Sequence, residues 1–321
     1  MEQYTIRFTQ EESEIMRDLA SRIENSSSLN SEEFCKEAKK LSETIPERIR
    51  EHLNEFAEKG SRNGYFLIQT GIKNNTLTPV NNRLKVGENT ELAKIQAILI
   101  HSISEMIAYE AEGFGNIFQD IVPVKSMSHE QTSIGSNTEL EIHTEQAFSK
   151  LRPDILCLAC LRGDPNAFTY ILPVHKIIDQ MTTKEKQLLR EQLWKIGVDL
   201  SFKLHGKEFA EGEIRGPMPI IYGDENDPYL TFDQDLMFSL NETGDFLLNK
   251  IENIYYKDRF QHNLRPGEII LIDNRRAVHG RSPFFPKYDG NDRFLVRCFS
   301  TFDYEKSAYA RTGRMVNAIY S

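Results

Sequence analysis

The sequence is short of basic residues, and this already narrows the possible functions. Its 321 residues include 39 lysines and arginines against 48 aspartates and glutamates, which gives a net charge of −9. A nucleic-acid-binding protein needs a positively charged surface, so we do not expect a nucleic-acid partner. Hydrophobic residues make up 39% of the chain, which is enough for a large core.

Long apolar runs are also missing. No run of apolar residues approaches the ~18 that a membrane-spanning helix needs, so we expect no membrane partner. Residues 1–9 are charged and contain few apolar side chains, and we do not interpret them as a secretory signal.

The four cysteines, Cys35, Cys157, Cys160 and Cys298, are too few for a disulfide scaffold in a chain of this length. Cys157 and Cys160 have the C-x-x-C spacing of a redox pair or of half a zinc site. They lie within the apolar run 155–161, however, which is typical of a buried strand, and we interpret them as strand residues. This cysteine usage favours a reducing compartment, and we expect a cytoplasmic protein.

The first third of the sequence predicts helices. Thr9 and Glu12 form a capping box, and apolar residues follow at helical spacing as far as Ile23. Further helices are predicted at residues 30–41, 45–59 and 90–112, and a short strand at 63–68.

From residue 113 onward, short strands alternate with loops. They are predicted at residues 139–144, 154–161, 168–172, 267–273 and 293–299. A helix is predicted at 182–196, where Thr182 and Glu185 form a capping box, and a glycine-rich mobile lid at 204–218.

This order of elements predicts an α+β fold. We expect a double-stranded β-helix, or jelly roll, with flanking and mainly N-terminal helices. We interpret residues 1–321 as a single domain, because no repeat or linker is evident. The helical buttress would occupy about 1–112 and the jelly-roll core about 113–321, with the inserted helix and lid at 182–240.

The most informative motif lies at residues 141–145, which read E-I-H-T-E. On a strand, residues i and i+2 point to the same face, so His143 and Glu145 can point to one centre. A second, distant histidine would complete a triad that leaves three coordination positions open, as in non-haem Fe(II) oxygenases. Taken alone, the pair also fits a surface histidine or a satisfied core histidine.

A second segment supplies the candidate for the third ligand. Residues 266–274 predict a turn and a buried strand, and His279 follows them directly before a glycine. Residues 292–297 predict another strand, which places Arg293 and Arg297 on one face. Two arginines that point inward need anions, and a guanidinium binds a carboxylate through two parallel hydrogen bonds.

With H-x-E, a distal histidine and an arginine fourteen residues after it, the sequence resembles the Fe(II)/2-oxoglutarate-dependent oxygenases. Within them it resembles the clavaminate synthase-like group, which includes hydroxylases of free arginine, asparagine and lysine; the resemblance covers about residues 63–302. It implies that Fe(II), 2-oxoglutarate and O2 are required. It also implies that His143, Glu145 and His279 bind the iron, and that Arg293 and Thr169 bind 2-oxoglutarate.

An acidic segment suggests what the substrate carries. Asp233 and Asp235 stand at i and i+2 and, on the sequence alone, fit a solvated acidic loop. In the enzymes that the sequence resembles, such a segment lies over the site and gives a carboxylate to a cationic side chain, which favours Asp233 before Asp235. Carboxylates in a closed pocket would select an ammonium or guanidinium group.

A free amino acid also needs partners for its α-groups. Ser133 matches the position of a substrate-contacting serine in the group, and Gln131 would share its face if this segment is extended. Glu112, at the end of the helix predicted at 90–112, is a candidate for the α-ammonium; the alternative is a solvated carboxylate at a helix end. Arg297 is the candidate for the α-carboxylate.

We therefore expect a 2-oxoglutarate-dependent dioxygenase that hydroxylates C3 or C4 of a free basic L-amino acid. L-Lysine is the first choice of substrate and L-arginine the second. Two alternatives remain open, an oxygenase acting on a carrier-bound or peptidyl amino acid and a non-catalytic metal-binding jelly-roll protein. The sequence leaves the oligomeric state open.

Overall fold

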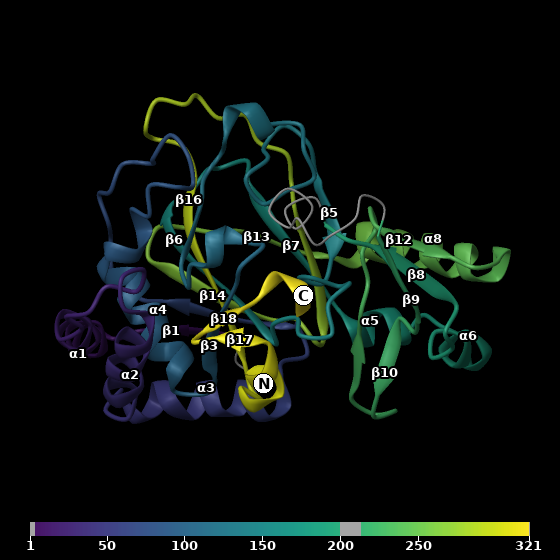
Figure 1. Ribbon diagram of the computed structural model, residues 1–321, viewed down its shortest axis with the longest axis horizontal. Coiled ribbons are helices and arrows are strands. Elements are labelled where there is room, and N and C mark those ends of the chain that lie inside the picture. Colours follow the sequence, from purple (N-terminus) through teal and green to yellow (C-terminus); the bar gives the residue numbers. More distant parts are fainter. Residues whose placement is uncertain (1–3, 200–212, 321) are drawn as a thin grey trace.

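The computed structural model describes residues 4–199 and 213–320, and its largest element is a nine-stranded mixed sheet (Figure 1). The strand order is β1-β2-β14-β6-β16-β3-β18-β17, with β4 also paired to β16. The strands are β1 (Thr5–Arg7), β2 (Tyr65–Gln69), β3 (Glu105–Tyr109), β4 (Gln119–Ile121), β6 (Ile155–Arg162), β14 (Glu268–Asp273), β16 (Phe294–Thr301), β17 (Arg311–Thr312) and β18 (Met315–Val316). The prediction of mixed helix and sheet is confirmed.

The central strands of this sheet are buried on both faces. Along β6, Cys157 and Ala159 pack in one apolar cluster, whereas Leu158 and Cys160 pack in another on the opposite face. Cys157 and Cys160 therefore point away from each other, since side chains alternate along a strand. All four cysteines are buried and free, which confirms their interpretation as structural residues.

Four N-terminal helices cover one face of the large sheet (Figure 1). They are α1 (Gln10–Ser21), α2 (Ser31–Ser42), α3 (Glu47–Lys59) and α4 (Glu91–His101). The capping box of Thr9 and Glu12 is present at the start of α1, as predicted. The predicted buttress also contains β1, β2 and β3, which are part of the sheet itself. The buttress and the sheet are thus joined by backbone hydrogen bonds as well as by packing.

A four-stranded sheet of order β13-β7-β15-β5 lies over the other face. Its strands are β5 (Leu140–His143), β7 (Phe168–Pro173), β13 (Phe260–Asn263) and β15 (Ala277–Arg281). Ile142, Ile171 and Val278 from this sheet share one core with Leu158 and Leu295 from the large sheet. The two sheets are therefore stacked on a common apolar layer.

The remaining elements lie at the far end of the four-stranded sheet (Figure 1). They are α5 (Val174–Ile178), α6 (Thr183–Leu188), β8 (Trp194–Gly197), β9 (Ile214–Met218), β10 (Ile221–Gly223), β11 (Pro228–Leu230), β12 (Met237–Ser239) and α8 (Glu242–Asp258). Helix α8 was not predicted from the sequence. Among the described residues, no helix is both long and apolar enough to cross a membrane.

The helix predicted at 90–112 is wrong in its second half, because α4 ends at His101 and a strand follows. The Ser102 and Ser104 hydroxyls donate to carbonyls of the last helical turn at 2.6 and 3.1 Å. After them, Met106 and Ile107 are buried in different clusters, as alternate residues of a strand require. Strand β3 then pairs with β16, so the main-chain hydrogen bonds of this segment go to the sheet.

The helix predicted at 182–196 begins at its capping box, as expected, but α6 ends at Leu188. Residues Trp194–Gly197 form β8, which lies between β12 and β9. Trp194 is fully buried there, so the apolar residues of this segment serve a sheet. Of the predicted lid at 204–218, residues 204–212 lie outside the described part of the chain, and Ile214–Met218 forms β9.

Candidate metal centre and active site

Three potential metal ligands converge between the two sheets. His143 in β5 and His279 in β15 are direct register partners, and their ring centroids lie 4.4 Å apart. Glu145 lies just after β5, and its Oε2 is 3.4 Å from His279 Nε2 and 4.0 Å from His143 Nε2. The ligand atoms of the three residues all lie within 4.8 Å of one another, so they can surround one ion. His279 was expected just after a strand, but it lies within one.

Hydrogen bonds and charges prepare these groups for a metal. His143 Nδ1 lies 2.8 Å from the Glu141 carbonyl, so this nitrogen carries the proton and Nε2 is left for the ion. Burial lowers the pKa of His143, which favours the neutral imidazole that a metal needs. Burial alone would raise the pKa of Glu145, but Arg297 and the two imidazoles lower it below its usual range, so the carboxylate is ionised.

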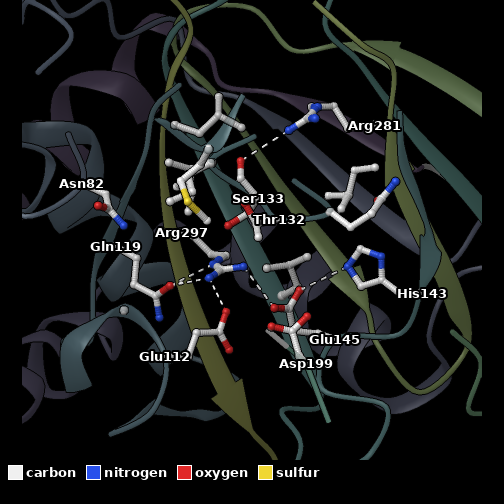
Figure 2. A pocket seen from close by; sticks show the side chains of 18 of the residues that line it. Asn82, Glu112, Gln119, Thr132, Ser133, His143, Glu145, Asp199, Arg281 and Arg297 are labelled. Carbon is white, nitrogen blue, oxygen red and sulfur yellow. Dashed lines mark hydrogen bonds and ion pairs between the residues drawn. The ribbon is translucent and has the colours of Figure 1, made fainter. Parts of the chain in front are cut away.

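Arg297 connects the metal centre to a second buried carboxylate. Its Nη1 donates to Glu145 Oε1 at 3.0 Å, and its Nη2 donates to Glu112 Oε1 (Figure 2). Gln119 Oε1 accepts from Nε at 3.1 Å and from Nη2. A guanidinium has five N–H groups, so within the described residues one Nη1–H of Arg297 is left for a ligand. Burial raises the pKa of Glu112, although Arg297 opposes this.

Arg293 is a buried cation that has no anionic partner among the described residues. Its side chain is only 6% exposed, and its guanidinium lies 5.8 Å from the centre of the Phe284 ring. No ion pair or hydrogen bond from this guanidinium to any described residue is present. Burial lowers the pKa of Arg293 to about 10. A buried charge without a partner is costly, so this position is suited to an anionic ligand.

One cavity of about 510 Å³ brings all the predicted site residues together. Its lining includes His143, Glu145, His279, Thr169, Arg293, Arg297, Glu112, Gln131, Ser133, Asp233 and Asp235. These residues come from both sheets and from the loops between their strands, so the cavity is formed by the stacking of the sheets.

The two aspartates differ in their surroundings. The main chain of Asp233 forms a bridge with His143, and its Oδ1 accepts a hydrogen bond from Leu236 N at 2.8 Å. Burial raises the pKa of Asp233 to about 7. Asp235 also lines the cavity, but its side chain is exposed. The less exposed Asp233 carboxylate therefore has the greater need of a cationic partner.

Residues 128–134 form turns and bends, so the condition under which Gln131 would share a strand face with Ser133 is not met. The Gln131 side chain bonds to β5, because its Nε2 donates to Glu139 O at 2.9 Å and its Oε1 accepts from Glu141 N at 3.1 Å. The Ser133 carbonyl accepts from Arg281 Nη1 at 3.4 Å (Figure 2). The amide partners of Gln131 are thus main-chain groups, which fix this loop against the sheet.

The expectation that Glu112 ends a helix is also wrong. Glu112 follows β3 and precedes a short 3-10 turn, and its Oε2 accepts from Gln146 Nε2 at 2.7 Å. Sequence reasoning missed Gln119 and Asp199, which both line the cavity (Figure 2). Neither residue belongs to a motif, and only the folded chain brings them to the site.

Two imidazoles and one carboxylate on neighbouring strands define the class of site. This donor set lines a cavity and matches the facial triad of mononuclear non-haem Fe(II) oxygenases, so the three residues would hold an ion beside that cavity. Nitrogen and carboxylate ligands also accept other divalent metals, so the donor set fits Fe(II) without excluding them.

Comparison with known proteins assigns the family. Residues 218–299 match the model described as "Taurine catabolism dioxygenase TauD, TfdA family". The chain is 45% identical over 293 residues to L-lysine 3-hydroxylase of Catenulispora acidiphila, which covers 90% of this chain and 82% of the relative. It is 30% identical over 319 residues to enduracididine β-hydroxylase of Streptomyces hygroscopicus, covering 91% and 92%.

A solved structure is similar over almost the whole chain. The asparagine oxygenase complex with Fe(II), 3-hydroxyasparagine and succinate has a TM-score of 0.90 and 26% identity, covering 98% of this chain and 99% of that one. The chain therefore belongs to the Fe(II)/2-oxoglutarate-dependent oxygenases, in the clavaminate synthase-like group. The resemblance inferred from the sequence motifs is confirmed.

Proposed function

We propose that this chain is a 2-oxoglutarate-dependent dioxygenase that hydroxylates free L-lysine at C3. The observation that carries the proposal is one cavity that holds the potential metal triad, the half-buried Asp233 carboxylate and the Arg293 cation, which has no ionic partner among the described residues. The similarity to an L-lysine 3-hydroxylase supports lysine over arginine, and C3 over C4.

His143, Glu145 and His279 would hold Fe(II), since their ligand atoms already face one another. Arg293 would bind the distal carboxylate of 2-oxoglutarate through its guanidinium fork, and Thr169 would add a hydroxyl. When bound, Fe(II) with 2-oxoglutarate and O2 supplies the oxidising power that hydroxylates an unactivated C–H bond. The chain itself binds and orients the reactants and excludes water.

The charges of the cavity match the three charges of lysine. The remaining Nη1–H of Arg297 would meet the α-carboxylate, and Glu112 would accept from the α-ammonium, with Ser133 nearby in the lining. Asp233 would bind the ε-ammonium, and the exposed Asp235 would add a weaker attraction. Holding both ends of the substrate fixes which C–H bond faces the metal.

The proposal also includes the type of fold, the cellular location and the partner of the protein. The two stacked sheets would form the double-stranded β-helix of the family, in a single domain of residues 1–321, because they share one apolar core. The four free, buried cysteines support a cytoplasmic location, where thiols stay reduced. The partner of this protein would be its small-molecule substrate.

Incubation of the purified protein with Fe(II), 2-oxoglutarate, O2 and each free amino acid in turn tests this function. We expect succinate and a hydroxylated product with L-lysine, and NMR of the product should place the hydroxyl at C3. A His279→Ala variant is the matched control, and it should form neither. Turnover only with another amino acid, or no turnover with lysine, would overturn the substrate assignment. The metal site would then be tested separately, by measuring metal binding.

A further inference from the structure

The main chain at Glu145 is held by one side chain. Glu145 lies just after the end of β5, so no regular strand partner takes its N–H and C=O. Asn274 replaces such a partner, because its Oδ1 accepts from Glu145 N at 2.7 Å and its Nδ2 donates to Glu145 O at 3.1 Å. The same Nδ2 donates to Pro153 O at 2.8 Å. Asn274 is fully buried, and these bonds use both amide hydrogens and the amide oxygen.

Asn274 also connects the two parts of the chain that carry the ligands. It follows β14 directly and lies in the turn that leads into β15, the strand of His279. Its own N–H donates to Asp154 O at 2.9 Å, which fixes the turn against the start of β6. The residue after Glu145, Gln146, has a φ of 52°, so the chain turns sharply directly after the ligand.

We propose that Asn274 is a positioning residue that fixes Glu145 for the metal. This inference rests on the proposed function in one respect, namely that Glu145 binds the metal. The direction of the carboxylate follows from the placement of the Glu145 backbone and from Arg297, which donates to Oε1. A side-chain amide suits this position because it can accept from one main-chain group and donate to another, whereas an ionised aspartate cannot donate.

Metal titration of two variants tests the inference. We would remove metal from the protein, add Co(II) and measure both the dissociation constant and the visible spectrum, which reports coordination geometry. Asn274→Ala and Asn274→Ser should bind Co(II) about 10- to 100-fold more weakly, as is usual when a residue supporting a ligand is removed, and their spectra should change. The matched control is Asn263→Ala, which removes hydrogen bonds to Asp164 O and Ala167 O outside the metal centre.

The possible outcomes separate the inference from the function on which it rests. A wild-type protein that binds no Co(II) contradicts the proposed metal site itself. If the wild type binds Co(II) and both Asn274 variants bind it within threefold with the same spectrum, the positioning role is refuted. The Asn263→Ala control should lose thermal stability and keep both readouts, which shows that lower stability alone does not change them. Asn274→Ser leaves a smaller cavity than Asn274→Ala. If the alanine variant does not fold, the serine variant is used for both measurements.

Discussion

Replacing Arg293 should affect cosubstrate affinity and protein stability in opposite directions. Burial lowers the pKa of Arg293 from its ordinary 12.5 to about 10, which corresponds to a cost of about 3 kcal/mol for keeping this guanidinium charged. An Arg293→Met variant removes this cost, so we expect the free protein to be as stable as the wild type, or up to about 3 kcal/mol more stable.

The same change should abolish tight binding of 2-oxoglutarate. Removing one partner of a buried ion pair costs about 3–5 kcal/mol, and about 1.4 kcal/mol is a factor of ten, so the affinity should fall by at least about 100-fold. Arg293→Lys keeps the charge but loses the two parallel N–H groups of the guanidinium. Its affinity for 2-oxoglutarate should therefore lie between those of the wild type and Arg293→Met. Urea unfolding without ligands and anaerobic calorimetry of the Mn(II)-loaded protein with 2-oxoglutarate measure the two effects.

Arg314 offers the matched control, because it is also buried but is paired with Glu32 and Glu105 outside the cavity. Arg314→Met should lower the free energy of unfolding and leave 2-oxoglutarate affinity unchanged, the opposite pattern. If Arg293→Met binds 2-oxoglutarate within threefold of the wild type, or loses stability as Arg314→Met does, Arg293 is a structural residue and the reasoning above is wrong.

Three further predictions concern the substrate, the metal and the thiols. Asp233→Asn should raise the KM for lysine by about 10-fold or more, because this carboxylate is partly shielded from water, whereas the exposed Asp235 should matter less and Asp235→Asn should raise the KM less than about fivefold. Equal effects of the two changes in steady-state kinetics would contradict the assignment. A divalent metal at 100 times its dissociation constant should stabilise the fold by about 2.7 kcal/mol, seen as a higher Tm, and no rise should occur in His279→Ala. Burial raises the pKa of Cys35 and of Cys160 to about 12, so iodoacetamide at pH 8 should label neither in the native protein and all four cysteines after unfolding; rapid native labelling would contradict their burial.

Local patterns of the sequence predicted six of the 18 described strands, among them the central strands of the large sheet, and the potential metal ligands. The strand that carries Arg297 follows from a run of apolar residues, and the shared face of His143 and Glu145 follows from strand periodicity. The segment 102–109 was predicted incorrectly because it continues an apolar pattern that a helix and a strand can share. Its pairing with β16 and β18, which lie far along the chain, decides for the strand.

The support of the site was less accessible to sequence analysis. Asn274 and Gln119 act through contacts with residues more than 100 positions away, and no local motif marks such contacts. Gln131 was assigned to the substrate because its position was judged from an assumed extended segment. Side-chain amides are particularly difficult to assign in this way, since they serve main-chain groups and ligands equally well.

The direct pairing of His143 with His279 makes the metal centre sensitive to the alignment of two strands. A slip of β5 by one residue would turn its side chains to the other face and carry the imidazole of His143 away from the ion. Metal binding would thus stabilise only the fold in which the two strands are correctly aligned. Iron supply would then influence how much of the newly made protein matures, as well as how fast the mature enzyme works.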